Sequence, residues 1–160
     1  GIVMAVEKVK EHLKKYGLDG KIVELSSSLA TVHDAAESLG CSESEIAKSM
    51  AFSLSDGYIV VVMSGDVKID NSKYKATFHE KAHMVSPEIL ESVIGHPMGG
   101  VCPFALNEGV KVYLDDSLKR FSRVYPSCGS IHNAIGLTLE ELENASEYTG
   151  WVDITKKKEV

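Results

Sequence analysis

The sequence predicts a mixed α/β fold in which short strands form a barrel-like mixed sheet and short helices surround it. Two observations favour this class: strand and helix patterns interleave along the chain, and at least one pair of strands is joined by a tight turn. The segments are too short for a regular winding of strand, helix and strand. The 160 residues are 44% hydrophobic and 25% charged, as is typical of globular proteins, so we expect residues 1–160 to form one domain.

The chain begins with the pattern of an amphipathic helix. Val6, Val9 and Leu13 recur at helical spacing between charged residues, and Gly17 follows as a stop signal. Residues 22–25 have the composition of a short strand.

Two helix starts follow in close succession. Thr31 is placed to cap a helix that runs to Gly40. Ser42 and Glu45 form a capping box, which predicts a shorter helix at residues 43–48.

The middle of the chain has the pattern of a hairpin. Strands at residues 50–54 and 58–63 flank a turn at residues 55–57. The second strand is apolar throughout, so we expect it in the centre of the sheet. Residues 65–66 end it.

The second half alternates helices and short strands. We expect helices at residues 70–78 and 86–95, the latter because Ser86 and Pro87 form a strong helix start. Residues 95–109 show no regular pattern. The remaining expected elements are strands at residues 110–114, 124–125 and 151–154, a turn at residues 126–129, a helix capped by Thr138 and Glu141, and a solvated basic tail at residues 156–158.

Charge and cysteine content restrict the partners and the compartment. Lys and Arg number 17 against 23 Asp and Glu, a net charge of −6, which disfavours duplex DNA as a partner but allows contact with one nucleic-acid end. The longest apolar run is far shorter than the roughly 20 residues that span a bilayer, and the N-terminal pattern is not that of a signal peptide, so we expect no membrane association. Cys41, Cys102 and Cys128 are read as free thiols of a reducing, cytoplasmic compartment.

One motif matches the sequence pattern of a zinc site. His79, Glu80 and His83 fit H-E-x-x-H, in which two histidines one helical turn apart bind zinc. The helix start at Ser86 interrupts such a helix, and Lys81 places a cation inside the motif. We therefore expect no metal and no cofactor, and we interpret this run as a polar helix end that leads into a short strand.

Three features remain as candidates for chemistry. Gly99 and Gly100 lie between prolines, where glycine allows the backbone to approach a ligand, although an ordinary surface loop explains them equally well. Cys102 is either a nucleophile or a small buried hydrophobe, and the chain has no G-x-S-x-G elbow. Lys48, expected at a helix–strand junction, is either a solvated charge or a fixed cation for a phosphate or a carbonyl.

Together these segments resemble the YbaK/ProX family of aminoacyl-tRNA deacylases, which includes the editing domain inserted in bacterial prolyl-tRNA synthetases. The resemblance covers about residues 31–154, and its specific part is the Gly-Gly-x-x-Pro-Phe loop at its distance from Lys48. The segments that support it are, in order, Lys48, the two hairpin strands, Gly65-Asp66, and residues 94–104, 112–115, 124–130 and 137–142.

The resemblance implies a mixed α/β fold around a barrel-like sheet, and a trans-editing hydrolase that cleaves the ester of mischarged tRNA, most often prolyl tRNA. Lys48 corresponds to the family lysine that holds the 3′-terminal nucleotide, and Gly99 and Gly100 to the loop that positions the substrate. The implied substrate-binding residues are Val101, Cys102, Pro103, Phe104, Gly129 and Ser130. Ala134 lies near the acidic position of the cysteine-clearing branch, which argues against cysteine as the amino acid removed.

The expected partners are the acceptor end of mischarged tRNA and prolyl-tRNA synthetase. An activated ester needs only a water, an oxyanion stabiliser and correct placement, so the N–H groups of Gly99 and Gly100 can suffice. Cys102 is expected to line the pocket without acting as the nucleophile. Lys73, Lys75, Lys119 and Arg120 either help to hold the acceptor end or form a solvated face. The alternative function is a non-catalytic module that binds a tRNA end, a nucleotide or a synthetase, and a zinc hydrolase is a distant third.

Overall fold

The central element of the fold is an antiparallel hairpin of β2 (Ile46–Leu54) and β3 (Gly57–Ser64). Leu54 pairs with Gly57, so the connection between the strands is a two-residue turn. The side chains from Val60 to Met63 have no exposed surface, because both faces of β3 are covered. This confirms the hairpin and the central position of its second strand.

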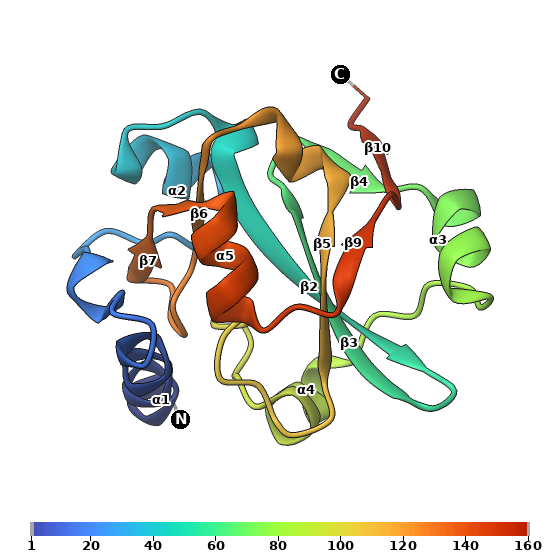
Figure 1. Ribbon diagram of the computed structural model, residues 1–160, viewed down its shortest axis with the longest axis horizontal. Coiled ribbons are helices and arrows are strands. Elements are labelled where there is room, and N and C mark those ends of the chain that lie inside the picture. The colour runs from blue at the N-terminus through green and yellow to red at the C-terminus, as the bar shows by residue number, and fades with distance from the viewer. Residues whose placement is uncertain (1, 160) are drawn as a thin grey trace.

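Four further strands extend this hairpin into a six-stranded mixed sheet in the order β8-β6-β2-β3-β5-β9. The computed structural model, which describes residues 2–159, shows the sheet curled into a half-barrel with the helices outside it (Figure 1), and this confirms the expected fold class. The added strands are β5 (Lys111–Asp115), β6 (Arg123–Pro126), β8 (Leu137–Thr138) and β9 (Gly150–Val152). β3, β5 and β9 pair in parallel, β6 lies parallel to β2, and β8 is antiparallel to β6.

Two small antiparallel sheets flank the main one. β1 (Ile22–Glu24) pairs with β7 (Asn133–Ile135), and β4 (Val67–Ile69) pairs with β10 (Thr155–Lys157). The sequence pattern predicted β1 but not β4, β7 or β10. The expected basic tail at residues 156–158 is therefore partly wrong: the lysine side chains are exposed, but the backbone as far as Lys157 is paired with β4.

Between residues 2 and 159 the chain forms five α-helices, all in segments where the sequence pattern predicts a helix. They are α1 (Ile2–Lys14), α2 (Val32–Leu39), α3 (Asn71–Phe78), α4 (Pro87–Ile94) and α5 (Leu139–Ser146). The Thr31 side chain accepts a hydrogen bond from the Asp34 N–H, and Thr138 and Glu141 form the expected capping box of α5. Three short 3₁₀ segments occur at Asp19–Lys21, Glu43–Glu45 and Asp116–Arg120.

The predicted helix at residues 43–48 stops after a single 3₁₀ turn. The capping box between Ser42 and Glu45 is present, but Ile46 already has an extended backbone and pairs with Tyr125 of β6. Lys48 consequently lies inside β2, opposite Met63, and not at a helix end. The capping box predicts where a helix starts but contains no information on its length.

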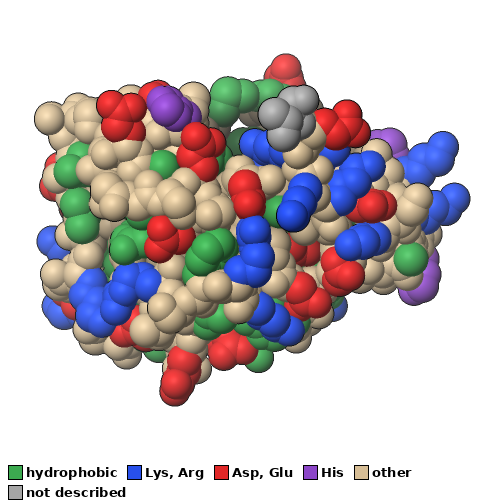
Figure 2. Space-filling view, turned by 90° about the horizontal axis from the view of Figure 1, so that it is seen from above, with side chains coloured by type: hydrophobic (Ala, Val, Ile, Leu, Met, Phe, Trp, Pro, Cys, Tyr) green, Lys and Arg blue, Asp and Glu red, His purple; other side chains and the backbone are tan. Residues whose placement is uncertain are grey.

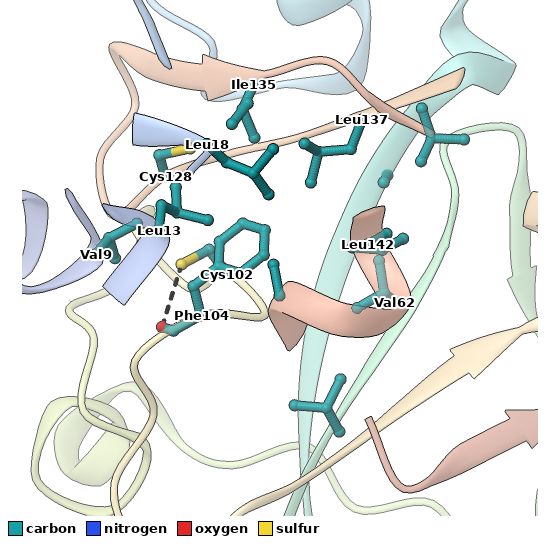
Figure 3. Packing of buried hydrophobic residues seen from close by; sticks show 14 of the residues in the cluster. Val9, Leu13, Leu18, Val62, Cys102, Phe104, Cys128, Ile135, Leu137 and Leu142 are labelled. Carbon is teal, nitrogen blue, oxygen red and sulfur yellow. Dashed lines mark hydrogen bonds between the residues drawn. The ribbon is translucent and has the colours of Figure 1, made fainter. Parts of the chain in front are cut away.

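The largest core cluster joins α1, α5, the strands and the irregular loop that follows α4. Val9 and Leu13 from α1 meet Cys102 and Phe104 from the loop, and all four are fully buried (Figure 3). The loop at residues 95–109 is irregular, as expected, but a third of its residues are buried.

A buried carboxylate joins the end of β5 to the C-terminal part of the chain. Asp115 is fully buried and accepts hydrogen bonds from the N–H of Ser117 (2.9 Å), the N–H of Ile154 (2.9 Å) and the hydroxyl of Thr155 (2.7 Å). Removing the carboxylate leaves two buried donors and one part-buried donor without acceptors, and each buried one costs about 1–3 kcal/mol.

We expect Asp115→Ala to lower the free energy of unfolding by roughly 2–5 kcal/mol. Asp115→Asn keeps the shape of the side chain, but its NH₂ group faces other hydrogen-bond donors. The free energy of unfolding of this variant should lie between those of Asp115→Ala and wild type. The control is Asp116→Ala, which removes only a surface ion pair with Lys119 and should cost less than about 1 kcal/mol. Urea unfolding checks all three variants, and equal losses at both positions would contradict the account of Asp115.

Candidate functional site

A mainly apolar cavity lies at an open edge of β2. This strand pairs with β6 only through Ile46 and Ala47, and its edge is next covered where the Val85 N–H donates to the Ala51 carbonyl (3.0 Å). A cavity of about 330 Å³ occupies the gap between these two points. The interrupted pairing therefore creates the site and exposes sheet backbone to it.

The lining of the cavity is mainly aliphatic. Its polar members are Thr31, Lys48, Ser49, Tyr125 and Ser127. Within the described part of the chain, the lining includes no Asp, Glu, His or Cys. Aliphatic contributions come from α2, β2, α4, the Met84–Val85 segment and the glycine loop. Such a surface favours a small uncharged group, and it supplies neither a carboxylate base nor a thiol nucleophile.

Lys48 lies at one side of this cavity. Its ammonium donates to the carbonyl of Val67 at 2.5 Å. Burial and the nearby ammonium of Lys158 lower the pKa of Lys48 to about 8, against a smaller opposing effect of Asp66. Lys48 is thus a half-buried cation held against a backbone carbonyl, at a residue that lines the cavity.

Ser49 is a polar group of the cavity that the sequence analysis missed. Its hydroxyl is buried and has no hydrogen-bond partner among the described residues. The Ala51 carbonyl and the Ser53 N–H point outward from the hairpin, to Val85 and His83, so the alternation of an antiparallel pair directs the N–H and C=O of Ser49 to the same open edge. The only signal in the sequence was a second polar residue directly after Lys48 in β2.

The glycine loop reaches the cavity through Gly99 and Val101. Gly99 has φ +84°, and the Gly100 N–H donates to the Pro97 carbonyl at 2.9 Å, so residues 97–100 form a turn that requires glycine at its third position. The expectation that both glycine N–H groups are free for a ligand is therefore wrong for Gly100. Among the described residues the Gly99 N–H has no protein acceptor, and it remains a candidate donor to substrate.

Gly100 has a packing role instead. It is buried, and a Cβ placed on it would lie 2.5 Å from the carbonyl oxygen of Gly129. Gly129 has φ +94° and packs against the Ala5 carbonyl of α1. Ser130 is 3% exposed and donates its hydroxyl hydrogen bond to Asn133. Gly129 and Ser130 thus support the loop from behind, and neither lines the cavity at the edge of β2.

Three other expected substrate-binding residues point away from the cavity. Cys102 and Phe104 are fully buried in the core (Figure 3), and Pro103 lines a separate hollow that includes His12. The expectation that Cys102 lines the pocket is therefore wrong, because the alternation that turns Val101 outward turns Cys102 inward. Burial raises the pKa of the Cys102 thiol to about 12, although its sulfur lies 3.5 Å from His96 Nε2.

The H-E-x-x-H run does not form the helix that a zinc site needs. His79 ends α3 in a left-handed conformation (φ 64°), and Glu80 accepts hydrogen bonds from Ser55. The Ser53 N–H bonds to the His83 carbonyl, so the run continues as an extended segment beside β2. Between residues 2 and 159, no group of three or more His, Cys, Asp or Glu residues is arranged to hold a metal, and no helix is long and apolar enough to cross a membrane.

Comparison with known proteins places this geometry in context. A family model described as "Aminoacyl-tRNA editing domain" matches residues 26–145. "Uncharacterized protein YwhH" of Bacillus subtilis (strain 168) is 46% identical over 155 residues, which cover 96% of this chain and 98% of that protein.

More distant relatives are parts of larger enzymes. The proline–tRNA ligase of Thermotoga sp. (strain RQ2) is 30% identical over 90 residues, which cover 56% of this chain but only 15% of the ligase. A crystal structure described as a candidate trans-editing enzyme for prolyl tRNA synthetase superposes with a TM-score of 0.86 at 25% identity, over 95% of this chain and 97% of that one.

The two loop glycines should differ in their tolerance of a side chain. Gly100→Ala should cost about 1–3 kcal/mol of folding free energy because the new Cβ meets backbone, whereas Gly99→Ala should cost about 1 kcal/mol for its left-handed φ. Gly20→Ala, where a Cβ meets nothing within 4 Å, is the neutral control. Urea unfolding of the three variants checks the order, and a Gly100→Ala variant as stable as Gly20→Ala would contradict it.

Proposed function

Because the chain belongs to the aminoacyl-tRNA editing domain family, we propose that it is a trans-editing hydrolase that removes a wrong amino acid from the 3′ end of tRNA. The family match agrees with the resemblance inferred from Lys48 and the glycine loop. The observation that supports the proposal most directly is the cavity at the open edge of β2, which brings Lys48, Ser49 and Gly99 around one space.

The cavity favours a small, uncharged aminoacyl group. Its aliphatic walls match a short apolar side chain, and none of its described lining residues is an acid that would select a cationic one. The outward C=O and the hydroxyl of Ser49 are placed to accept hydrogen bonds from the substrate α-amino group. About 330 Å³ also leaves room for part of the terminal ribose beside the amino acid.

The proposed reaction is attack of a water oxygen on the carbonyl carbon of the ester. The tetrahedral intermediate places negative charge on the former carbonyl oxygen, which the Gly99 N–H stabilises. Collapse breaks the bond to the ribose oxygen, which takes a proton as the free amino acid leaves. No enzyme nucleophile is required, in agreement with the buried position and the raised pKa of the Cys102 thiol. Lys48 holds the terminal nucleotide so that the ester reaches Gly99.

Prolyl tRNA is the proposed carrier, and prolyl-tRNA synthetase the proposed partner. The support comes from the proline–tRNA ligases among the relatives and from the description of the similar crystal structure. We place this activity in the cytoplasm, where charged tRNA is used.

A deacylation panel tests the proposal. Purified protein at catalytic concentration is mixed with tRNA-Pro charged with alanine, serine, threonine, cysteine or proline, and release of the amino acid is followed. We expect turnover with a small uncharged amino acid, alanine first, and none with proline. Binding of the tRNA without turnover of any of the five would overturn the hydrolase and leave a binding module.

Lys48→Ala should keep the fold but lower deacylation by about tenfold to a thousandfold, the range for loss of a positioning or electrostatic contact. Lys48→Arg should rescue only in part, because a planar guanidinium does not replace a compact ammonium. Since the pKa of Lys48 is about 8, its charge is lost as pH rises through that value, so the wild-type rate corrected for spontaneous hydrolysis should fall above about pH 8.

Single-turnover rates from pH 6.5 to 9.5 measure this effect, and Lys14→Ala on the exposed face of α1 is the control. The Arg variant should lose the fall above pH 8, because a guanidinium keeps its proton. A wild-type rate in Lys48→Ala would remove Lys48 from the site.

Ser49→Ala should stabilise the protein by about 0.5–1 kcal/mol, because it deletes a buried hydroxyl that has no partner. The same change should lower kcat/KM by roughly threefold to tenfold, the equivalent of one neutral hydrogen bond to substrate. The control is Ser64→Ala on β3, whose hydroxyl donates to the Ser117 carbonyl (3.2 Å), so this variant should lose stability and keep activity. Thermal melts and deacylation kinetics separate the two, and a Ser49→Ala variant with full activity would exclude the hydroxyl from substrate binding.

A further inference from the structure

The ribbon of β4 and β10 places like charges opposite each other. Lys156 of β10 pairs in register with Lys68 of β4, and cross-strand partners point to the same face. Two lysines directly opposite in an antiparallel pair repel each other and destabilise it. The stability of the fold does not explain why two lysines face each other here. Binding of an anionic partner would explain it.

A third lysine connects this ribbon to the cavity. Lys158 directly follows β10, and its N–H donates to the Asp66 carbonyl (3.3 Å). This places the Lys158 side chain beside the ammonium of Lys48, which itself bonds to the Val67 carbonyl of β4. The basic surface of Lys68, Lys156 and Lys158 thus begins at the side of the cavity where Lys48 lies.

The acidic groups near this surface are largely engaged elsewhere. Both oxygens of Asp66 accept hydrogen bonds from Arg120 (2.6 and 3.0 Å), and Asp70 caps α3 through the Lys73 N–H, although it also faces Lys156. Glu159 lies 3.6 Å from Lys68 and is 88% exposed. In the space-filling view, Lys and Arg side chains gather over this part of the face, with Asp and Glu between them (Figure 2).

Three of the four other basic residues that the sequence analysis considered are paired. Lys73 binds Asp153 (3.0 Å), Lys119 binds Asp116 (2.9 Å), and Arg120 holds Asp66. Lys75 is exposed on α3. The charges left over for a ligand beside Lys48 are therefore those of β4 and β10. The matched editing-domain model ends at residue 145, so β10 lies outside it.

We propose that Lys68, Lys156 and Lys158 form a binding surface for the phosphates of the single-stranded 3′ end of tRNA, continuous with Lys48 at the cavity. This inference rests on the proposed function and adds the route by which the RNA reaches the site. Lys156 and Lys158 are about 7 Å apart along the chain, at about 3.3 Å per residue, a spacing suited to successive phosphates. An acidic protein can hold RNA in this way because only a local surface has to be basic.

The test uses a fluorescein-labelled RNA hairpin that copies the acceptor stem of tRNA-Pro and ends in single-stranded CCA. Its Kd is measured by anisotropy from 50 to 300 mM salt for wild type and for the triple variant Lys68→Gln, Lys156→Gln, Lys158→Gln. We expect the triple variant to bind at least tenfold more weakly at low salt. The slope of log K against log salt should fall by about 2, since each phosphate contact on a single strand contributes about 0.7.

A triple variant of equal charge, Lys10→Gln, Lys14→Gln, Lys15→Gln, is the matched control, since these three lysines are exposed in and just after α1 at the opposite end of the molecule (Figure 1). It should bind within twofold of wild type. An equal loss in both triples, or no loss in the first, would overturn the inference. So would equally tight binding of wild type to a blunt hairpin of the same charge.

Stability and turnover separate the remaining explanations. Lys156→Gln alone should unfold at the same or a higher temperature than wild type, because it relieves the repulsion with Lys68, so weaker binding would not reflect a damaged fold. If wild type releases amino acid while the first triple binds RNA normally, only this inference fails. If wild type binds the hairpin through these lysines but releases no amino acid, the hydrolase proposal fails and the surface stands.

Discussion

The candidate site depends on one interruption of sheet pairing. β6 pairs with β2 over only two residues. Beyond them the edge of β2 has no partner until the Val85 N–H bonds to the Ala51 carbonyl. An open edge is usually a liability, because its unpaired N–H and C=O groups invite another strand. Here the open edge forms part of a cavity that is also lined by α2, α4 and the glycine loop.

The elements that could be predicted from the sequence are those with local causes. Thr31 and Thr138 mark helix starts through side-chain hydrogen bonds within one turn, and Pro87 marks another through its position in the first turn. The apolar run of β3 indicates its burial directly. Pairings between distant segments leave no such local pattern. β7 is only three residues long, and β10 consists of one threonine and two lysines, so their pairing follows from the fold around them.

The site was predictable as a set of segments and not as a set of side chains. Lys48, Gly99 and Val101 do meet at the cavity, whereas Cys102, Phe104 and Gly129 serve the packing behind it. A sequence motif consists of residues that are adjacent in the chain. In an extended loop, however, the side chains of successive residues point in opposite directions, so only some of them reach the cavity. Gly100 is an example, because a side chain at this position would collide with the carbonyl of Gly129, which lies on another segment of the chain. Ser49 was missed because a serine in a strand gives no functional signal by itself, and β2 also contains Ser53.

The buried Asp115 also determines how the C-terminal strand meets a partner. By holding Ile154 and Thr155, it fixes the chain immediately before Lys156, so the following lysines extend from an anchored backbone. A basic tail that was free in solution would lose conformational entropy when it bound, roughly 1–2 kcal/mol for each residue whose backbone became ordered. In this protein the conformational entropy of that segment is already lost during folding. A ligand therefore binds to an ordered surface and does not have to order it.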